Sequence, residues 1–241
     1  HMNEKEKIIT STGEKLLYHP AVVARLKQYK AAYPISLQIA PTSKCNLNCV
    51  FCSNVHRNKN EEIDAALLCS ILSNLTALGL KTVEWTGGGE PTLYTYLNTV
   101  LLYAERLGLK QGLISNGLLV KRIAPENLRA LLWLRISMNC LDYVNEIDIP
   151  EFKGVLGFSY VMNEKTTPDI IANLKRHVEK HKPKYVRIVP NCQASLEEQE
   201  SNHAMYSDVV NSWGDPFFYQ AKHFVKPEKC WWGYLKPFLL H

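Results

Sequence analysis

Short apolar runs along the chain alternate with longer segments in which apolar residues recur every three or four positions. The short runs are rich in β-branched and aromatic residues, which is typical of strands. They are ISLQIAP (35–41), TVEWTG (82–87), QGLISNG (111–117), LWLRISMN (132–139), VLGFSYVMN (155–163) and YVRIVP (185–190). The longer segments have the spacing of helices, most clearly at 62–80, 96–109 and 169–181, with an N-terminal helix at 20–33.

The alternation of strand and helix predicts βαβ units, a parallel sheet and right-handed crossovers. The connections near 125–132 and after 141 are short and carry the weakest helical pattern. Six units suit a partial, TIM-like (β/α)6 barrel with an open edge better than a closed eight-fold barrel. In either architecture, ligands bind at the carboxyl ends of the strands.

Three segments follow from this pattern. Residues 1–34 hold a tag remnant, His1-Met2, and the first helix, and residues 35–190 form the barrel. Residues 191–241 form a short C-terminal extension, with a polar helix candidate at 195–213 and a possible extra strand at 216–224.

Composition narrows the function classes. The chain has 241 residues and a net charge of +5, which does not indicate nucleic acid binding. No apolar run approaches the roughly 20 residues of a membrane span, and the polar start is no signal peptide. We therefore expect a cytoplasmic protein. Of seven cysteines only three cluster, and in a reducing compartment clustered cysteines bind metal or carry out redox chemistry more often than they form disulfides.

Cys45, Cys49 and Cys52 follow the first strand with C-x3-C-x2-C spacing. Three thiolates can hold three irons of a [4Fe-4S] cluster and leave the fourth iron open for catalysis. The alternatives are a zinc site with His56 as fourth ligand, or no metal. We expect His56 and Arg57 to be solvated loop residues, although basic side chains beside an anionic cluster could tune its reduction potential.

The second strand ends in EWTGGGEPTL (84–93), where three glycines precede Glu90 and Pro91. Glycines allow a ligand to approach the backbone closely, which a zinc knuckle does not need. A phosphate-binding loop is the alternative, but neither G-x-G-x-x-G nor a Walker lysine is present.

Together, CNLNCVFC and GGGEP resemble the motifs of the radical S-adenosylmethionine (radical SAM) superfamily, and the likeness covers about residues 35–190. The lead-in LQIAPTSKCNLNC resembles the branch of molybdenum-cofactor maturases and of peptide-modifying enzymes with a SPASM or twitch extension.

The resemblance implies site residues. Cys45, Cys49 and Cys52 would hold a [4Fe-4S] cluster, and the amino and carboxylate groups of S-adenosylmethionine (SAM) would chelate its open iron. The residues implied to contact SAM lie at the ends of successive strands. They are Phe51, Gly87, Gly88, Gly89, Glu90, Ser115, Asn116, Ser137, Asn139, Asn163 and Val189, of which Asn163 could contact the substrate instead.

The implied reaction is reductive cleavage of SAM to a 5′-deoxyadenosyl radical, which takes hydrogen from a peptide, a small metabolite or a nucleotide. The enzyme would be oxygen-sensitive and would receive electrons from a flavodoxin or ferredoxin. Two alternatives remain: an activase that installs a glycyl radical in a partner protein, and a non-catalytic zinc or iron–sulfur module.

The other cysteines have different expected roles. Cys69 and Cys140 are expected to be small core residues. Cys192 follows the sixth strand and is expected to pack in the core, with a position facing the site as the alternative. Cys230, in KPEKCWWGYLKPFLLH, is either a buried structural cysteine or the first ligand of an auxiliary iron–sulfur cluster. The second reading expects a longer natural chain that carries further cysteines. Independently of these two readings, the apolar PFLLH segment would leave hydrophobic side chains exposed unless it folds back onto the barrel.

Overall fold

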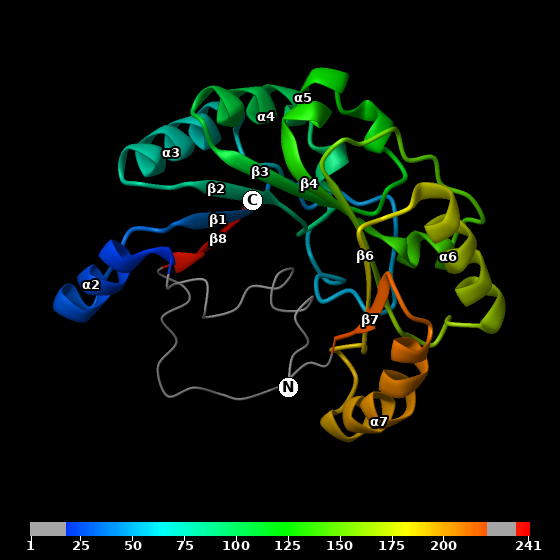
Figure 1. The fold of residues 1–241 in the computed structure, drawn as a ribbon. Coiled ribbons are helices and arrows are strands. Elements are labelled where there is room, and N and C mark those ends of the chain that lie inside the picture. Colours follow the sequence, from blue (N-terminus) through cyan, green and yellow to red (C-terminus); the bar gives the residue numbers. More distant parts are fainter. Residues whose placement is uncertain (1–17, 221–234) are drawn as a thin grey trace.

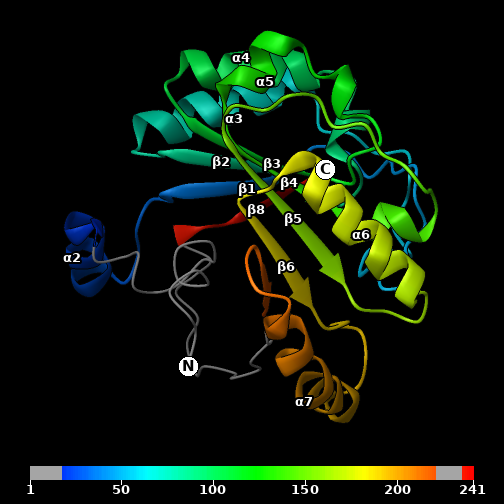
Figure 2. The same ribbon diagram turned by 45° about the vertical axis from the view of Figure 1, so that its right-hand side comes forward.

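The protein is built on one curved parallel sheet. The computed structural model describes residues 18–220 and 235–241. Eight strands pair in the order β7-β6-β5-β4-β3-β2-β1-β8, and every pairing is parallel. The sheet bends into an arc whose two edge strands do not meet, and helices cover its outer side (Figure 1 and Figure 2). The predicted open, TIM-like barrel is confirmed, with one more strand at each edge of the six.

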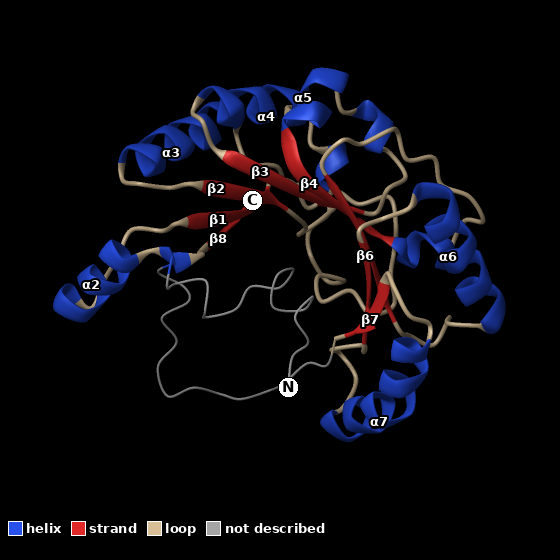
Figure 3. Cartoon of the chain, in the orientation of Figure 1, coloured by secondary structure: helices blue, strands red, loops and turns tan. Residues whose placement is uncertain are grey.

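The elements follow the predicted alternation closely (Figure 3). The strands are β1 Ser36–Ala40, β2 Thr82–Trp85, β3 Lys110–Ser115, β4 Leu131–Ser137, β5 Val155–Val161, β6 Tyr185–Val189, β7 Phe217–Tyr219 and β8 Phe238–Leu240. The α-helices are α2 Pro20–Tyr29, α3 Ala65–Ala77, α4 Leu97–Arg106, α5 Pro125–Ala130, α6 Pro168–His181 and α7 Leu196–Ser212. Between β4 and β5 the structure has a 3-10 turn, Met138–Asp142, and no α-helix.

Side-chain caps set several helix starts. Asp64 accepts a hydrogen bond from the backbone N–H of Leu67 at 2.8 Å, so α3 begins a few residues later than its apolar pattern suggests. Thr167 and Ser195 cap α6 and α7 in the same way.

The two faces of the sheet have different environments. Leu134 and Ile136 of β4 and Phe158 of β5 are fully buried in the core between the sheet and the helices. Because side chains alternate along a strand, the residues between them face the concave side. Small residues make room there. A Cβ atom added to Gly157 would lie 2.1 Å from the ring of Tyr185, so this ring lies directly over the glycine.

Residues 235–241 return to the first strand, as expected for PFLLH. The N–H of Ile35 donates to the carbonyl of Leu235, and that of Gln38 to the carbonyl of Pro237, both at 3.0 Å. β8 then pairs with β1 from Gln38 to Ala40. Strands beyond residue 190 thus belong to the same sheet as the predicted barrel.

Two further observations concern the rest of the chain. None of the helices in the described part has the length and apolar character needed to cross a bilayer. Cys230 lies outside the described residues, so its predicted role stays a prediction.

Candidate functional site

The predicted motifs meet at the carboxyl edge of the sheet, because parallel strands all end on the same side. The cysteine loop follows β1, the glycine loop follows β2, and Ser115 and Asn116 end β3. These strands are neighbours in the sheet, in the order β3-β2-β1. The cysteine loop, the glycine loop and the end of β3 therefore lie side by side, although they are spread over residues 45–116 of the sequence.

The cysteine loop is anchored at its start and leaves its thiols half-buried. The N–H of Ser43 donates to the carbonyl of Glu61 at 2.9 Å, which holds the loop against the segment before α3. Burial, followed by the neighbouring Cys45 and Cys52, raises the pKa of the Cys49 thiol to about 11. Burial also raises the pKa of Cys45. Without a bound metal these thiols stay protonated at neutral pH, and metal binding would release their protons.

The three cysteines supply the kind of ligand that an iron–sulfur cluster uses. Thiolates are the usual ligands of a [4Fe-4S] cluster, and each binds a different iron. Within residues 18–220 and 235–241, no group of three His, Cys, Asp or Glu side chains that could hold a metal ion is present. His56, the fourth ligand of the alternative zinc site, is exposed. The chemistry of the donor set fits the predicted cluster, and ligation by these cysteines stays a prediction.

Arg57 is not a solvated loop residue, and the expectation for it was wrong. Its Nε donates to the carbonyl of Ser43 at 2.8 Å, and its Nη1 donates to the carbonyl of Asn54 and lies 3.5 Å from the Cys52 sulfur. The planar guanidinium can satisfy several acceptors at once, which a sequence pattern does not reveal. Arg57 therefore stabilises the conformation of the cysteine loop by hydrogen bonds to its backbone.

The glycine loop lies directly against the cysteine loop. A Cβ atom on Gly89 would lie 2.1 Å from the Lys44 carbonyl oxygen, so only glycine fits here. The N–H of Glu90 donates to the same carbonyl at 2.7 Å. A Cβ atom on Gly88 would lie 2.6 Å from the imidazole of His241, which places β8 beside this loop.

Glu90 joins the glycine loop to the end of β3. Its buried carboxylate accepts hydrogen bonds from the hydroxyl and N–H of Thr92, the hydroxyl of Ser115 at 2.7 Å and the N–H of Asn116 at 2.7 Å. Burial raises the pKa of Glu90, and these bonds oppose that rise. The Asn116 amide then donates to Oδ1 of Asn46 in the cysteine loop at 2.7 Å. One chain of bonds thus holds three loops together.

This network bears on the implied SAM contacts. The side chains of Glu90, Ser115 and Asn116 are all buried and bonded within the protein. What they do in this structure is position the loops. Their direct contact with SAM stays a prediction, as does that of the backbone of Gly87, Gly88 and Gly89.

A second polar network ties β4 to β5. Asp142 accepts hydrogen bonds from the Tyr160 hydroxyl at 2.8 Å and from the amides of Asn139 and Asn163, each at 3.1 Å. Asn139 also exchanges two bonds with the backbone of Val161. Both amide atoms of Asn139 are therefore committed inside the protein. Asp142, three residues after Asn139, was missed because it lies beyond the predicted strand.

The other implied contacts are dispersed along the same edge. Ser137 ends β4 on the concave face, in register with Ser159. Val189 ends β6 and is buried, and Phe51 is half-buried in the cysteine loop. The contacts of these residues with SAM stay predictions.

Tyr143 connects the cysteine loop to the β4–β5 network. Its hydroxyl donates to the carbonyl of Asn48 at 2.9 Å, and the ammonium of Lys165 lies 4.5 Å from the centre of its ring. Burial, followed by Cys49, raises the pKa of Tyr143 to about 12. Nothing in the spacing of the sequence pointed to this residue.

The remaining described cysteines differ in burial. Cys140 is buried and Cys69 packs partly against the core, as expected. Cys192 is exposed, so the expectation that it packs in the core was wrong. It follows β6 in a turn before α7, where the chain turns out to solvent.

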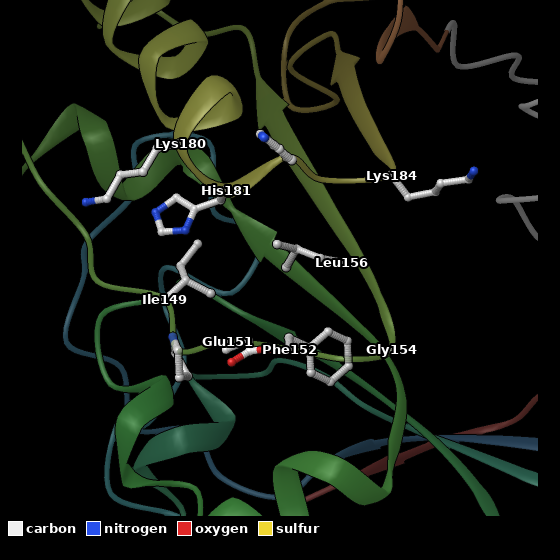
Figure 4. Close-up of a pocket in the computed structure, with 10 residues that line it drawn as sticks. Ile149, Glu151, Phe152, Gly154, Leu156, Lys180, His181 and Lys184 are labelled. Carbon is white, nitrogen blue, oxygen red and sulfur yellow. The ribbon is translucent and has the colours of Figure 1, made fainter.

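A surface cavity of about 360 Å³ lies at the opposite end of the strands, before β5 and after α6 (Figure 4). Ile149, Phe152 and Leu156 line it together with the ring of His181. The side chains of Lys180 and Lys184 point away from each other (Figure 4). Their charges do not converge on a ligand, and the cavity is far along the strands from the cysteine loop.

Comparison with known proteins agrees with this site. Residues 39–145 match the model of the Radical SAM superfamily. A probable GTP 3′,8-cyclase of Archaeoglobus fulgidus is 34% identical over 110 residues, which cover 44% of this chain and 36% of that protein. A PqqA peptide cyclase of Xanthomonas euvesicatoria is 27% identical over 190 residues, 75% of this chain and 49% of that protein. The chain spans less than half the length of these relatives.

A solved structure shares the fold over nearly the whole chain. Streptococcus suis SuiB bound to S-adenosylmethionine superposes with a TM-score of 0.61 at 18% identity, covering 96% of this chain and 65% of SuiB. The match to the Radical SAM model covers residues 39–145 of this chain. They run from the end of β1 to just after β4 and include the cysteine loop, the glycine loop and the end of β3.

Proposed function

We propose that this chain is a radical SAM enzyme. Cys45, Cys49 and Cys52 hold a [4Fe-4S] cluster, and the open iron and the glycine loop bind SAM. When bound, the cluster supplies the electron that cleaves SAM, and the resulting 5′-deoxyadenosyl radical takes a hydrogen atom from the substrate. The observation that carries the proposal is the direct hydrogen bond between the cysteine and glycine loops, from Glu90 to Lys44 at 2.7 Å.

The chain's own residues have definite tasks in this proposal. Glu90 and Asn116 hold the cysteine loop, the glycine loop and β3 in one arrangement. Backbone carbonyls around Gly87–Glu90 would accept hydrogen bonds from the SAM amino group. Ser137, Asn139, Asn163, Val189 and Phe51 would surround the nucleoside. The barrel wall would keep water and oxygen away from the reacting atoms.

The substrate class stays open between a peptide and a small metabolite or nucleotide. The names of the similar proteins include both a GTP 3′,8-cyclase and a PqqA peptide cyclase. The proposal includes a flavodoxin- or ferredoxin-type electron donor, a cytoplasmic location and sensitivity to oxygen. It also retains Cys230 as the candidate first ligand of an auxiliary cluster, which would need further cysteines after Cys230 that this sequence does not contain. A glycyl-radical activase remains the alternative enzyme.

Anaerobic reconstitution with iron and sulfide tests the proposal. The wild-type chain should bind one cluster at these cysteines, and replacing Cys45, Cys49 and Cys52 with Ala should abolish it. Cys192→Ala is the matched control, because it removes an exposed cysteine outside the loop. Full iron and sulfide content in the triple variant would refute the cluster assignment.

The reduced, reconstituted protein should then alter its EPR spectrum on addition of SAM and release 5′-deoxyadenosine slowly. A fully loaded, reduced cluster that neither binds SAM nor changes its spectrum would leave a non-catalytic iron–sulfur module as the function.

A further inference from the structure

The concave face of the sheet carries two arginines that form no ion pair with a carboxylate within the described residues. Arg135 lies on β4 and Arg187 on β6. Their neighbours along the strands, Leu134 and Ile136 and likewise Val186 and Ile188, pack in the core on the helix side. Because side chains alternate along a strand, both arginines point to the inside of the barrel.

Arg187 is only partly satisfied. Its Nη1 donates to Oε1 of Gln220 at 3.1 Å. Its Nε is buried and has no hydrogen-bond partner among the described residues. Burial, followed by the charge of Arg135, lowers the pKa of Arg187 to about 10, so it remains a cation at neutral pH. A buried N–H with no partner costs free energy, which a ligand acceptor would recover.

Two aromatic residues, Tyr185 and Trp133, position the guanidinium of Arg135. Its Nε lies 3.3 Å from the Tyr185 hydroxyl, and its guanidinium carbon lies 5.4 Å from the centre of the Trp133 ring. No other hydrogen bond of this guanidinium occurs within the described residues. The rings orient the fork of donors and leave its outer edge available.

The acidic side chain on the same face of the sheet, Glu84, is paired with other residues. Glu84 of β2 bonds to the Lys236 ammonium at 2.9 Å and to the Gln38 amide at 2.5 Å. With Glu84 paired to Lys236, the two arginines leave two positive charges on the concave face among these four ionised groups. Two like charges held near each other destabilise each other, and a bound anion would relieve that repulsion.

We propose that Arg135 and Arg187 bind a phosphate group of the substrate. The inference rests on the proposed function, since it places the substrate inside the barrel that holds SAM. A phosphate carries nearly two negative charges and accepts bidentate bonds from arginine, which matches two arginines on the same face of the sheet. A single carboxylate would neutralise only one of them.

The location places this pair of arginines deeper in the barrel than the residues that would surround the nucleoside of SAM. Arg135 is two residues before Ser137 at the end of β4, and Arg187 is two residues before Val189 at the end of β6. The glycine loop follows β2, and β3, β4 and β5 lie between β2 and β6 in the sheet. Arg187 therefore lies several strands away from the glycine loop.

Binding of inorganic pyrophosphate tests the proposal without any radical chemistry. Calorimetry at low salt would measure its affinity for the chain as isolated and for the reconstituted chain with SAM. Arg135→Gln and Arg187→Gln should each weaken binding at least about ten-fold. Arg187→Lys keeps the charge, loses the fork of donors and should weaken binding less. Arg129→Gln is the matched control, because Arg129 is exposed on α5.

Thermal unfolding adds a measurement that distinguishes binding from structure. Arg187→Gln should unfold without pyrophosphate at the same or a higher temperature than the wild type, since an unpaired buried charge is removed. A large loss of stability in both Arg187 variants, with unchanged affinity in the folded protein, would assign Arg187 a structural role and overturn the proposal.

The remaining outcomes are decisive as well. No binding by the wild type in either form, or equal binding by all variants, would overturn the phosphate site. Citrate bound in place of pyrophosphate would assign the pair to carboxylates and also contradict it. Loss of SAM affinity in the arginine variants would show that Arg135 and Arg187 bind SAM rather than the substrate, and would overturn the proposal. Pyrophosphate binding in a chain that assembles no cluster would refute the proposed function and leave this site standing.

Discussion

Arg57 shows how one side chain can act on the cysteine loop without being a ligand. It joins the carbonyls of Ser43 and Asn54 and reaches the Cys52 sulfur at 3.5 Å. Hydrogen bonds and positive charge near the sulfurs of an iron–sulfur cluster favour its more negative, reduced form. Arg57 should therefore raise the reduction potential of the proposed cluster.

Arg57→Gln should lower that potential, by up to about 60 mV if the lost interaction is worth about 1.4 kcal/mol to a one-electron couple. The measurement is an EPR-monitored redox titration of the reconstituted protein. Lys59→Gln removes the same charge from the same loop, but within the described residues the Lys59 ammonium donates to the Asn48 side chain and not to a cysteine, so the potential of this variant should change less. Equal shifts in the two variants would show that loop charge alone sets the potential.

At the scale of secondary structure elements, the ends of β4 and β5 depend on one carboxylate. Asp142 collects bonds from Asn139, Tyr160 and Asn163, which come from the turn after β4, from β5 and from the loop that follows β5. Burial raises the pKa of Tyr160 above its usual range, so its hydroxyl keeps the proton that it donates to Asp142. This tie holds the predicted SAM-binding edge of both strands in place.

Asp142→Ala should destabilise the protein by about 2–3 kcal/mol, because it leaves three partly buried donors without their acceptor. Urea unfolding monitored by circular dichroism would measure the change. Asp148→Ala is the control, since Asp148 is exposed and pairs with Lys121 on the surface. An equal decrease in the free energy of unfolding for Asp142→Ala and Asp148→Ala would mean that water satisfies the three donors as well as the Asp142 carboxylate does.

The edge strands are decided by pairing partners rather than by their own residues. β7 and β8 each have three residues, and β8 pairs with β1, some 200 positions earlier in the chain. A short apolar run does not indicate which other strand it pairs with. The same reasoning explains why β7 was predicted only as a possible strand.

At the scale of the whole molecule, the site is assembled from loops that follow three neighbouring strands of the open arc. The loops after β1, β2 and β3 share the Glu90–Asn116–Asn46 chain of bonds, and a bound cluster would cross-link the three cysteines of the first loop. Anything that binds the folded state alone stabilises it.

Removal of the cluster from the reconstituted protein should therefore lower the melting temperature measured under anaerobic conditions. Oxidation followed by chelation with EDTA would remove the iron. The Cys45/Cys49/Cys52→Ala variant, treated in the same way, should show no further change. An unchanged melting temperature in the wild type would place the cysteine loop outside the cooperative unit.

The sequence by itself determined the strand and helix alternation, the parallel open barrel and the clustering of Cys45, Cys49 and Cys52 near GGGE. These are local signals, since periodicity and spacing are set by neighbours in the chain and parallel strands end on one side of a sheet. Only the tertiary structure decided the roles of Arg57, Asp142 and Tyr143, the pairing of β8, and the approach of Arg135 to Arg187. Each depends on side chains or strands that meet across the fold, and contacts of that kind leave no periodic trace in the sequence.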